Sequence, residues 1–315
     1  LEVFGYHLAN ILIHVLNSIL WFFLVAEILR IEPQENRNWK NILPIVCSMI
    51  HLVNPLTIQT VTYISSRSSL LATFFYLLAF YIFVQILKPA KKDASKCKTP
   101  FLVFGFLVIL YLGIATKEIV ASFPLIASIY LWLSTPKEKQ KTIIPKISAI
   151  LFILLAFLAY RYLQQGNLFS LRADPTSENT HRLLYLLSQI KVIAGYYLLK
   201  LIAPFSLNFE PDIILYKTWF HWDWFASLII LFIIGIIIYR QNSYLIKFGA
   251  LWFFITLLPT SSFIPLKQLA TEHRAYLPGL GFSLILGCVF LNFRDRKNIT
   301  GILFIFFILF TSSLT

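Results

Sequence analysis

Residues 70–87 read LLATFFYLLAFYIFVQIL, and no charged side chain interrupts this apolar run. Coiled as an α-helix, a run of this length matches the hydrocarbon thickness of a bilayer. Similar runs recur along the 315-residue chain, in which 58% of the residues are hydrophobic, 17% aromatic and 13% charged. The composition therefore predicts an integral membrane protein and excludes a soluble enzyme, a disulfide scaffold and a disordered tail.

Ten apolar stretches have a length suited to crossing a bilayer, and some contain proline, which membrane helices tolerate when neighbours satisfy the freed backbone groups. They cover residues 6–29, 42–61, 70–87, 101–115, 119–133, 143–160, 224–239, 244–258, 280–293 and 299–310. We therefore predict an all-α, polytopic membrane protein of about ten transmembrane helices. Residues 1–315 are treated as one domain, since no repeat or flexible linker interrupts the pattern.

The distribution of charge predicts the orientation. The loops that follow residues 29, 87, 133, 239 and 293, together with the adjoining ends of the apolar stretches, carry 17 of the 27 basic residues and only 6 of the 14 acidic ones. The positive-inside rule assigns these loops to the cytoplasm. Because topology accounts for the net charge of +13, we expect membrane lipids and no nucleic acid as partners. Any active face is then periplasmic or lumenal, in a multi-pass protein of a bacterial plasma membrane rather than the endoplasmic reticulum.

Residues 161–223 form the largest segment on the outer side. The stretch 183–207 is apolar but contains Lys191 and Lys200. We expect an in-plane amphipathic or re-entrant helix here. The alternative, an eleventh span, would move the basic residues Arg240, Lys247 and Arg294 to the outside.

Two neighbouring ionisable residues, Lys117 and Glu118, stand between two apolar runs at an outer turn. Ionisable groups at a membrane boundary are costly unless they are paired or hydrated, so they indicate function. They are candidates for binding an anionic headgroup or a metal. The alternative is a structural ion pair between the two side chains.

Two further outer turns carry candidate anion ligands. Arg67 lies among four serines at a helix start, where a guanidinium and backbone N–H groups both attract phosphate; capping and interfacial snorkelling are the alternative roles. Glu272, His273 and Arg274 are adjacent in sequence and suit a phosphate ester with an associated proton transfer.

Polar residues also occupy one face of the first predicted helix. His7, Asn10, His14 and Asn17 follow helical spacing. We assign Asn10, His14 and Asn17 to interhelical hydrogen bonds, and His7, nearer the outer surface, to a ligand. The tryptophan-rich stretch 219–224 is interpreted as an aromatic belt, with sugar stacking as the alternative.

The chain has no P-loop, HExxH, GxSxG or Rossmann glycine pattern, and its three cysteines indicate no redox or zinc site. Nucleotide hydrolysis, zinc proteolysis and serine hydrolysis therefore lack support. A lipid-linked donor suits the candidate residues better, because it carries its own leaving phosphate within the membrane.

Five ordered stretches together resemble the multi-spanning O-mannosyltransferases of the GT-C superfamily that carry tetratricopeptide repeats after their membrane domain. They are GYHLANILIHVLN from Gly5, NPLTIQTVTYISSRSSLLA from Asn54, ATKEIVASFPLI from Ala115, GYYLLKLIAPFSLNFEP from Gly195 and LLPTSSFIPLKQLATEHRAYLPGLGF from Leu257. The resemblance implies transfer of mannose or a related sugar from a polyprenyl-phosphate donor to a protein hydroxyl. The acceptor is then a Ser or Thr of a protein or peptide.

The resemblance also implies roles for residues that match the family's motifs. Glu118 is the catalytic or orienting acid, while the main base is expected upstream of Leu1. The donor phosphate is held by Lys117, Arg67, Arg274 and His273, and the substrate is oriented by Glu272 and His7. No resident cofactor is implied with certainty, no metal ligand is assigned, and a divalent metal stays open.

The chain departs from the family pattern at three positions around one outer turn. Asn54 stands where the family often has His, Gln59 where it has Glu, and Ser69 where it has Asp. These losses of ionisable groups put metal binding and donor geometry in question. The alternative function is a non-enzymatic membrane protein, such as a lipid-linked sugar transporter or an assembly scaffold. A transporter is expected to contain charged or broken helices at the bilayer midplane and internal pseudo-symmetry, and the sequence shows neither feature clearly.

Overall fold

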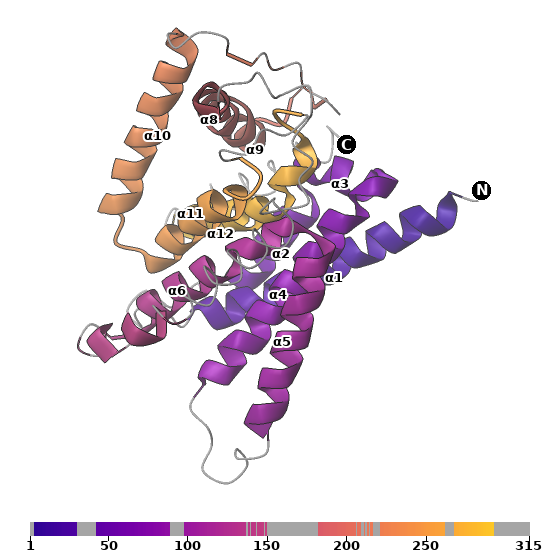
Figure 1. Ribbon diagram of the computed structural model, residues 1–315, viewed down its shortest axis with the longest axis vertical. Coiled ribbons are helices and arrows are strands. Elements are labelled where there is room, and N and C mark those ends of the chain that lie inside the picture. The colour runs from indigo at the N-terminus through magenta and orange to yellow at the C-terminus, as the bar shows by residue number, and fades with distance from the viewer. Residues whose placement is uncertain are drawn as a thin grey trace.

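The computed structural model describes residues 3–29, 42–88, 98–136, 182–205, 221–261 and 268–292, with scattered positions between 138 and 149 and between 207 and 216. These parts contain eleven α-helices joined by short 3₁₀ turns and one π-helix (Figure 1). The α-helices are α1 (Phe4–Ile28), α2 (Leu43–Leu52), α3 (Ile58–Thr62), α4 (Arg67–Leu87), α5 (Lys98–Thr116), α6 (Phe123–Ser134), α8 (Arg182–Lys191), α9 (Leu199–Ile202), α10 (Trp222–Arg240), α11 (Tyr244–Leu257) and α12 (Tyr276–Asn292). The shorter turns are η3 (Pro55–Thr57), η4 (Ile64–Ser66), η5 (Glu118–Ser122) and η9 (Glu272–Ala275), and η8 (Val192–Leu198) is the π-helix. The all-α prediction is confirmed.

Among the described residues, five helical segments are long and apolar enough to cross a membrane. They are Phe4–Ile28, Ile64–Leu87, Leu183–Ile202, Trp222–Arg240 and Glu272–Leu291, and the bent pair Leu43–Leu52 with Pro55–Thr62 is a sixth if it counts as one span. The chain is thus a multi-pass membrane protein. The three shorter apolar helices Pro100–Thr116, Glu118–Ser134 and Tyr244–Leu257 coincide with predicted spans. Most of 143–160 and all of 299–310 lie outside the described residues, so the number ten stays a prediction.

One predicted span, 42–61, is broken. The axis bends by 52° between α2 and the helical segment Pro55–Thr62. The bend arises because Pro55 lacks a backbone N–H and disfavours helical backbone at the residue before it. Asn54 is accordingly extended, with φ −70° and ψ 119°, and its side chain accepts a hydrogen bond from the Leu56 N–H at 3.0 Å.

Contacts between helices set their relative directions. Asn17 in α1 donates to the Leu70 carbonyl in α4 at 3.1 Å, and Glu27, ten residues later, pairs with Lys88 at 2.7 Å. α1 and α4 therefore run the same way. Phe83 contacts Phe106 at 6.2 Å between ring centroids, while Lys117 meets Ser69, so α5 runs opposite to α4.

The centre of the bundle is an aromatic cluster to which α1, α4, α6 and α11 contribute rings. Trp252 lies 5.4 Å from both Trp21 and Tyr76 between ring centroids, and all three rings are fully buried. Buried indole N–H groups need acceptors: Trp21 donates to Ser283 Oγ and Trp252 to the Leu277 carbonyl, each at 3.0 Å. These bonds fix the depth of α12 against its neighbours.

The segment expected to lie in plane forms a single helical rod, α8–η8–α9, covering Leu183–Ile202. Its length and mean hydropathy of 1.2 also satisfy the requirements for a span. In Figure 1, α8 is seen nearly end-on, whereas α10 and α5 lie along the plane of the view. The in-plane orientation stays a prediction, and a test of it is given below.

Candidate functional site

Most of the candidate residues lie at one end of the helix bundle. Arg67 begins α4, Lys117 follows the end of α5, and Glu272, His273 and Arg274 form η9 just before α12. α4 and α5 run in opposite directions, so the start of one meets the end of the other. The charge distribution predicts that this end is the outer one.

Lys117 anchors the first part of the site. Its backbone is extended, with φ −160° and ψ 143°, and its ammonium donates to the Ser69 hydroxyl at 2.7 Å in the first turn of α4. Burial lowers the pKa of Lys117 to about 8; the nearby Glu118 carboxylate opposes this shift and the Arg274 guanidinium adds to it. Lys117, Glu118 and Arg274 therefore share one electrostatic environment.

The alternative of a close Lys117–Glu118 ion pair finds no support in the geometry. Within the described ranges, no carboxylate lies within 4.0 Å of the Lys117 ammonium. The Lys117 ammonium bonds to a neutral hydroxyl, and the Glu118 charge offsets only part of the cost of its desolvation. This arrangement favours an anionic ligand.

The η9 turn supplies the second part. Its His273 N–H donates to Gln59 Oε1 at 2.9 Å, and Nε2 of His273 lies 3.3 Å from the Thr271 hydroxyl. Arg274 is only 8% exposed and donates to the Leu269 carbonyl at 3.3 Å. The Gln59 bond ties α3 to η9 and so holds this turn against the broken span.

Glu272 is hydrogen bonded to the π-helix η8 rather than to Lys117. Tyr196, in the π-helix η8, donates to Glu272 Oε1 at 3.3 Å, and the carboxylate is 3% exposed. The neighbouring Tyr197 donates to the Thr271 carbonyl at 3.1 Å and accepts from the Thr271 N–H at 3.2 Å. The rod α8–η8–α9 thus positions the segment 268–271, which leads into η9.

Sequence reasoning assigned no role to these two tyrosines. They stand within the GYYLLK part of a quoted stretch, but an apolar helix with adjacent tyrosines gives no sign of its partner. A π-helix is a further indication, because such segments are enriched at functional sites. That feature depends on backbone geometry and is not legible in the sequence.

Arg67 and His7 are not joined to Lys117 or Arg274 by any described contact. Arg67 Nε donates to Asn10 Oδ1 at 3.2 Å, and the guanidinium lies 5.0 Å from the ring centroid of Tyr6. Nη2 of Arg67 is buried without a partner. His7 is half-buried beside Tyr6. The predicted ligands therefore divide into a Lys117–η9 group and an Arg67 group, both at the start of α4.

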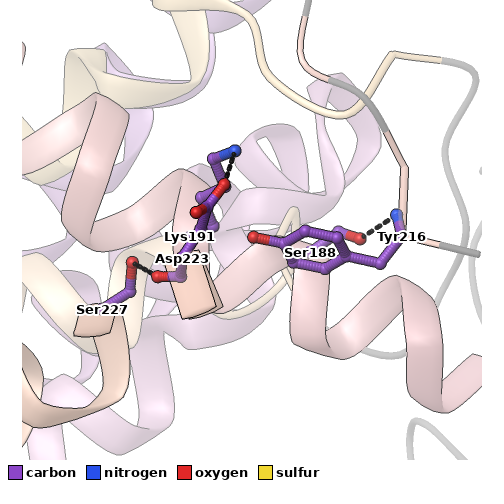
Figure 2. Close-up of polar contacts among 5 residues, drawn as sticks. All are labelled: Ser188, Lys191, Tyr216, Asp223 and Ser227. Atoms are coloured by element: carbon purple, nitrogen blue, oxygen red, sulfur yellow. Dashed lines mark hydrogen bonds and ion pairs between the residues drawn. The ribbon is translucent and has the colours of Figure 1, made fainter. Parts of the chain in front are cut away.

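A separate ion pair holds α8 against the start of α10 (Figure 2). Lys191 Nζ lies 2.9 Å from Asp223 Oδ2, and the Tyr216 N–H donates to Ser188 Oγ at 3.0 Å. Asp223 has 59% of its side chain exposed, so this pair contributes little to stability. Trp222 is 71% exposed, as expected for the predicted aromatic belt.

His14, Asn17 and Tyr276 form a polar network further along α1 from Asn10. Asn17 donates to the Tyr276 hydroxyl at 3.2 Å, and Nδ1 of His14 lies 2.7 Å from the same hydroxyl. Nε2 of His14 lies 3.2 Å from the Leu52 carbonyl, which only accepts, so Nε2 carries the proton and Tyr276 donates to Nδ1. With the bond from Asn10 to the Val61 carbonyl, the interhelical role predicted for Asn10, His14 and Asn17 is confirmed.

Among the described residues, no three His, Cys, Asp or Glu side chains are grouped to hold a metal ion. The described part of the chain therefore offers no donor set for the divalent metal that the resemblance left open. No family model, curated protein or solved structure matches the chain. The resemblance rests on the quoted motifs alone.

Proposed function

We propose that the protein is a membrane glycosyltransferase that moves mannose or a related sugar from a polyprenyl-phosphate donor to a protein Ser or Thr hydroxyl on the non-cytoplasmic face. The observation that carries the proposal is the half-buried Lys117 ammonium, bonded to the Ser69 hydroxyl and accompanied by Arg274. Among the described residues these two cations make no close ion pair, and such cations at the predicted outer end of membrane-spanning helices suit the phosphate of a lipid-linked donor.

In this proposal the cations act on the leaving group. Sugar transfer breaks the bond between the anomeric carbon and the donor phosphate oxygen, and negative charge develops on that oxygen. Lys117 and Arg274 stabilise this charge, with His273 beside them in η9. Glu118 orients the donor or the acceptor, and a general base takes the proton of the acceptor hydroxyl.

The test is a transfer assay with the full-length protein, a polyprenyl-phosphate mannose donor and a Ser/Thr peptide. Glu118→Gln and Arg274→Ala are expected to lower the rate about 100-fold or more. Lys141→Ala is the matched control, because Lys141 is exposed at the opposite end of the bundle. Transfer by both site variants at the unmodified rate would overturn the assigned roles. No transfer by the unmodified protein from any sugar-linked polyprenyl phosphate would overturn the proposed function.

A specific feature favours the second candidate, a lipid-linked sugar transporter. The α2–α3 pair is broken, and beside the break His51 is 1% exposed with neither ring nitrogen hydrogen bonded. Broken helices near the midplane are common in transporters. Movement of a fluorescent lipid-linked sugar across proteoliposomes containing the purified protein, without transfer to peptide, would favour this function.

A further inference from the structure

Ser69 and Lys117 form a close pair of hydroxyl and amine at the predicted outer end of the bundle. They are 48 positions apart in the sequence, and Lys117 Nζ lies 2.7 Å from Ser69 Oγ. They meet because α5 returns alongside α4, which brings its end to the first turn of α4 (Figure 1). A serine activated by a lysine from another helix needs no GxSxG pattern, so the sequence gives no sign of the pair.

The surroundings of Lys117 make its amine available as a base. Lys117 is half-buried, and burial lowers its pKa to about 8. The charged and titratable groups that face it are Glu118 in η5 and His273 and Arg274 in η9. Glu118 opposes the shift and Arg274 adds to it. At pH 8 about half of the molecules therefore carry a neutral Lys117 amine, which accepts a proton instead of donating one.

Ser69 has the surroundings of a nucleophile. It is the third residue of α4, it is 5% exposed, and its carbonyl accepts from the Thr73 hydroxyl at 2.8 Å. The first N–H groups of an α-helix have no partner within the helix, so they attract an oxyanion that forms beside Ser69. Arg274 adds positive charge on the side of Lys117. A nucleophile, a base and a region suited to developing negative charge thus lie together.

The position of the pair along the helices indicates a substrate class. Ser69 and Lys117 stand at the ends of the apolar runs 70–87 and 101–115, where the hydrocarbon core of a bilayer gives way to the polar headgroups. The ester carbonyls of membrane glycerolipids lie at the same boundary. The guanidinium of Arg274 favours a lipid whose headgroup is anionic.

We propose that Ser69 and Lys117 form a serine–lysine dyad that cleaves an acyl ester of an anionic membrane lipid. Ser69 Oγ attacks the ester carbonyl carbon while its proton passes to Lys117 Nζ. The bond from that carbon to the alcohol oxygen then breaks, the alcohol takes the proton from Lys117, and the acyl group stays on Ser69. Water, deprotonated by Lys117, hydrolyses the acyl-serine, which releases a fatty acid and restores both side chains.

The dyad goes beyond the proposed function and does not depend on it. Glycosyl transfer uses Lys117 as an ammonium that stabilises the donor phosphate, whereas the dyad uses the neutral amine. The rate of the dyad reaction therefore rises as the pH passes through 8, where the ammonium is lost.

Covalent labelling of the purified protein in detergent by a fluorophosphonate, located by peptide mass spectrometry, tests the dyad. Ser69 Oγ bonds to phosphorus and fluoride leaves. We expect the labelling rate of Ser69 to rise about tenfold per pH unit below pH 8 and to level off above it. Ser69→Ala removes this label. Lys117→Arg keeps the positive charge but cannot act as a base, and it lowers the rate about 100-fold or more.

Ser128 in α6 provides the matched control. It is 7% exposed, and its hydroxyl donates to the Pro124 carbonyl at 2.7 Å, so its proton is held by a carbonyl oxygen rather than an amine. Ser128→Ala leaves the labelling unchanged. Three results overturn the dyad: labelling of Ser69 no faster than that of Ser128, a rate for Ser69 that does not change between pH 6.5 and 9.5 in the unmodified protein, or labelling of Lys117→Arg at the unmodified rate.

Incubation with phosphatidylglycerol in mixed micelles at pH 9 tests the substrate class. The unmodified protein is expected to release fatty acid, and Ser69→Ala is expected to release none. Equal release by the two proteins, or release by neither, would overturn the assignment of a lipid ester. Both assays contain no sugar donor, so failure of glycosyl transfer leaves the dyad standing, and failure of the dyad leaves the proposed glycosyl transfer standing.

Discussion

Lys117 is the residue at which charge and burial conflict most directly. In the folded protein its pKa is about 8, against 10.5 for an unperturbed lysine. Between these pH values the unfolded chain holds more protons than the folded one, so stability rises with pH across that window. Below pH 8 the buried ammonium therefore costs stability, by up to about 3 kcal/mol for a shift of this size.

The prediction is that Lys117→Met is more stable than the unmodified chain at pH 7, and that most of this advantage is lost as the pH rises from about 8 to above 10.5. Thermal unfolding of the purified protein in detergent, across that range, is the measurement. Lys141→Met, at an exposed position, serves as the control and shows no such pH-dependent gain. An advantage for Lys117→Met that is equally large at both pH values would contradict a titrating buried amine. The same variant is expected to lose transfer activity.

Ser69 carries a second prediction. Its hydroxyl accepts the Lys117 hydrogen bond at 2.7 Å, and a carboxylate there would neutralise the ammonium and raise the pKa of Lys117 toward its usual value. Ser69→Asp is thus expected to weaken polyprenyl phosphate binding by roughly tenfold relative to Ser69→Asn, its neutral counterpart of similar size. The affinity of each variant for polyprenyl phosphate is measured by native mass spectrometry. Equal affinities would show that Lys117 does not contact the phosphate.

The sequence identified the chemistry of these residues better than their partners. Lys117, Arg274 and His273 were recognisable because ionisable groups beside apolar runs are rare. Their grouping depends on α5 returning against α4, and on Gln59 reaching His273 from a position 214 residues earlier. The three departures from the family pattern became interpretable only in the fold: Ser69 meets Lys117, Gln59 meets His273, and Asn54 caps η3.

At the scale of elements, α11 and α12 approach most closely at a pair of glycines. A Cβ added to Gly249 would lie 2.7 Å from the Gly281 carbonyl oxygen, and one added to Gly281 would collide with the Gly249 carbonyl oxygen. Small residues let membrane helices pack at backbone contact. This crossing also sets the depth of η9, which leads directly into α12.

Gly281→Ala is therefore expected to lower stability by about 1–3 kcal/mol, because the helices must move apart. Gly235→Ala on α10 is the matched control, since an added Cβ there meets nothing within 4 Å, and it should be neutral or slightly stabilising. Chemical unfolding in mixed micelles compares the two. Equal stability of both variants would mean that the α11–α12 interface adjusts without cost.

Span positions were predictable element by element, whereas breaks and local geometry were not. The apolar run 70–87 matches α4, which ends at Leu87. In lipid the backbone N–H and C=O groups have no water to bond to, so an unbroken helix, which satisfies them internally, is favoured. The run 42–61 has comparable composition, yet Pro55 breaks it. Proline alone does not decide this: Pro124 sits in the first turn of α6, where it needs no N–H partner and the helix begins normally.

For the whole molecule, helix directions constrain the topology of the outer segment. α6 contacts α4 in parallel, since Tyr76 meets Phe123 and Phe80 meets Tyr130, so α6 ends at the inner side. α11 packs antiparallel to α12, as the contacts Gly249–Gly281 and Trp252–Leu277 require. It therefore begins at the inner side, a short turn after α10. An odd number of crossings must separate α6 from the start of α10.

Two segments compete for that crossing, 143–160 and Leu183–Ile202, and they cannot both be spans without reversing α10. The contacts of the rod favour the segment 143–160 as the crossing. Gln189 and Tyr197, which lie eight residues apart on the rod, bond to the Leu269 and Thr271 carbonyls, both in the short segment before η9. A rod crossing the bilayer would carry them to different depths, whereas a rod lying along the outer surface keeps them level.

Cysteine labelling tests this prediction directly. Leu183→Cys lies at an exposed position in the first turn of the rod and Asn208→Cys at an exposed position after its end, in a chain whose own cysteines have been replaced. A membrane-impermeant maleimide added to sealed, right-side-out vesicles is expected to label both. Asn242→Cys, in the turn between α10 and α11, is the inner control and reacts only after permeabilisation. If only one of these two positions reacts from outside, the rod crosses the bilayer. The contacts of Tyr196 and Tyr197 with Glu272 and Thr271 would then lie within the membrane.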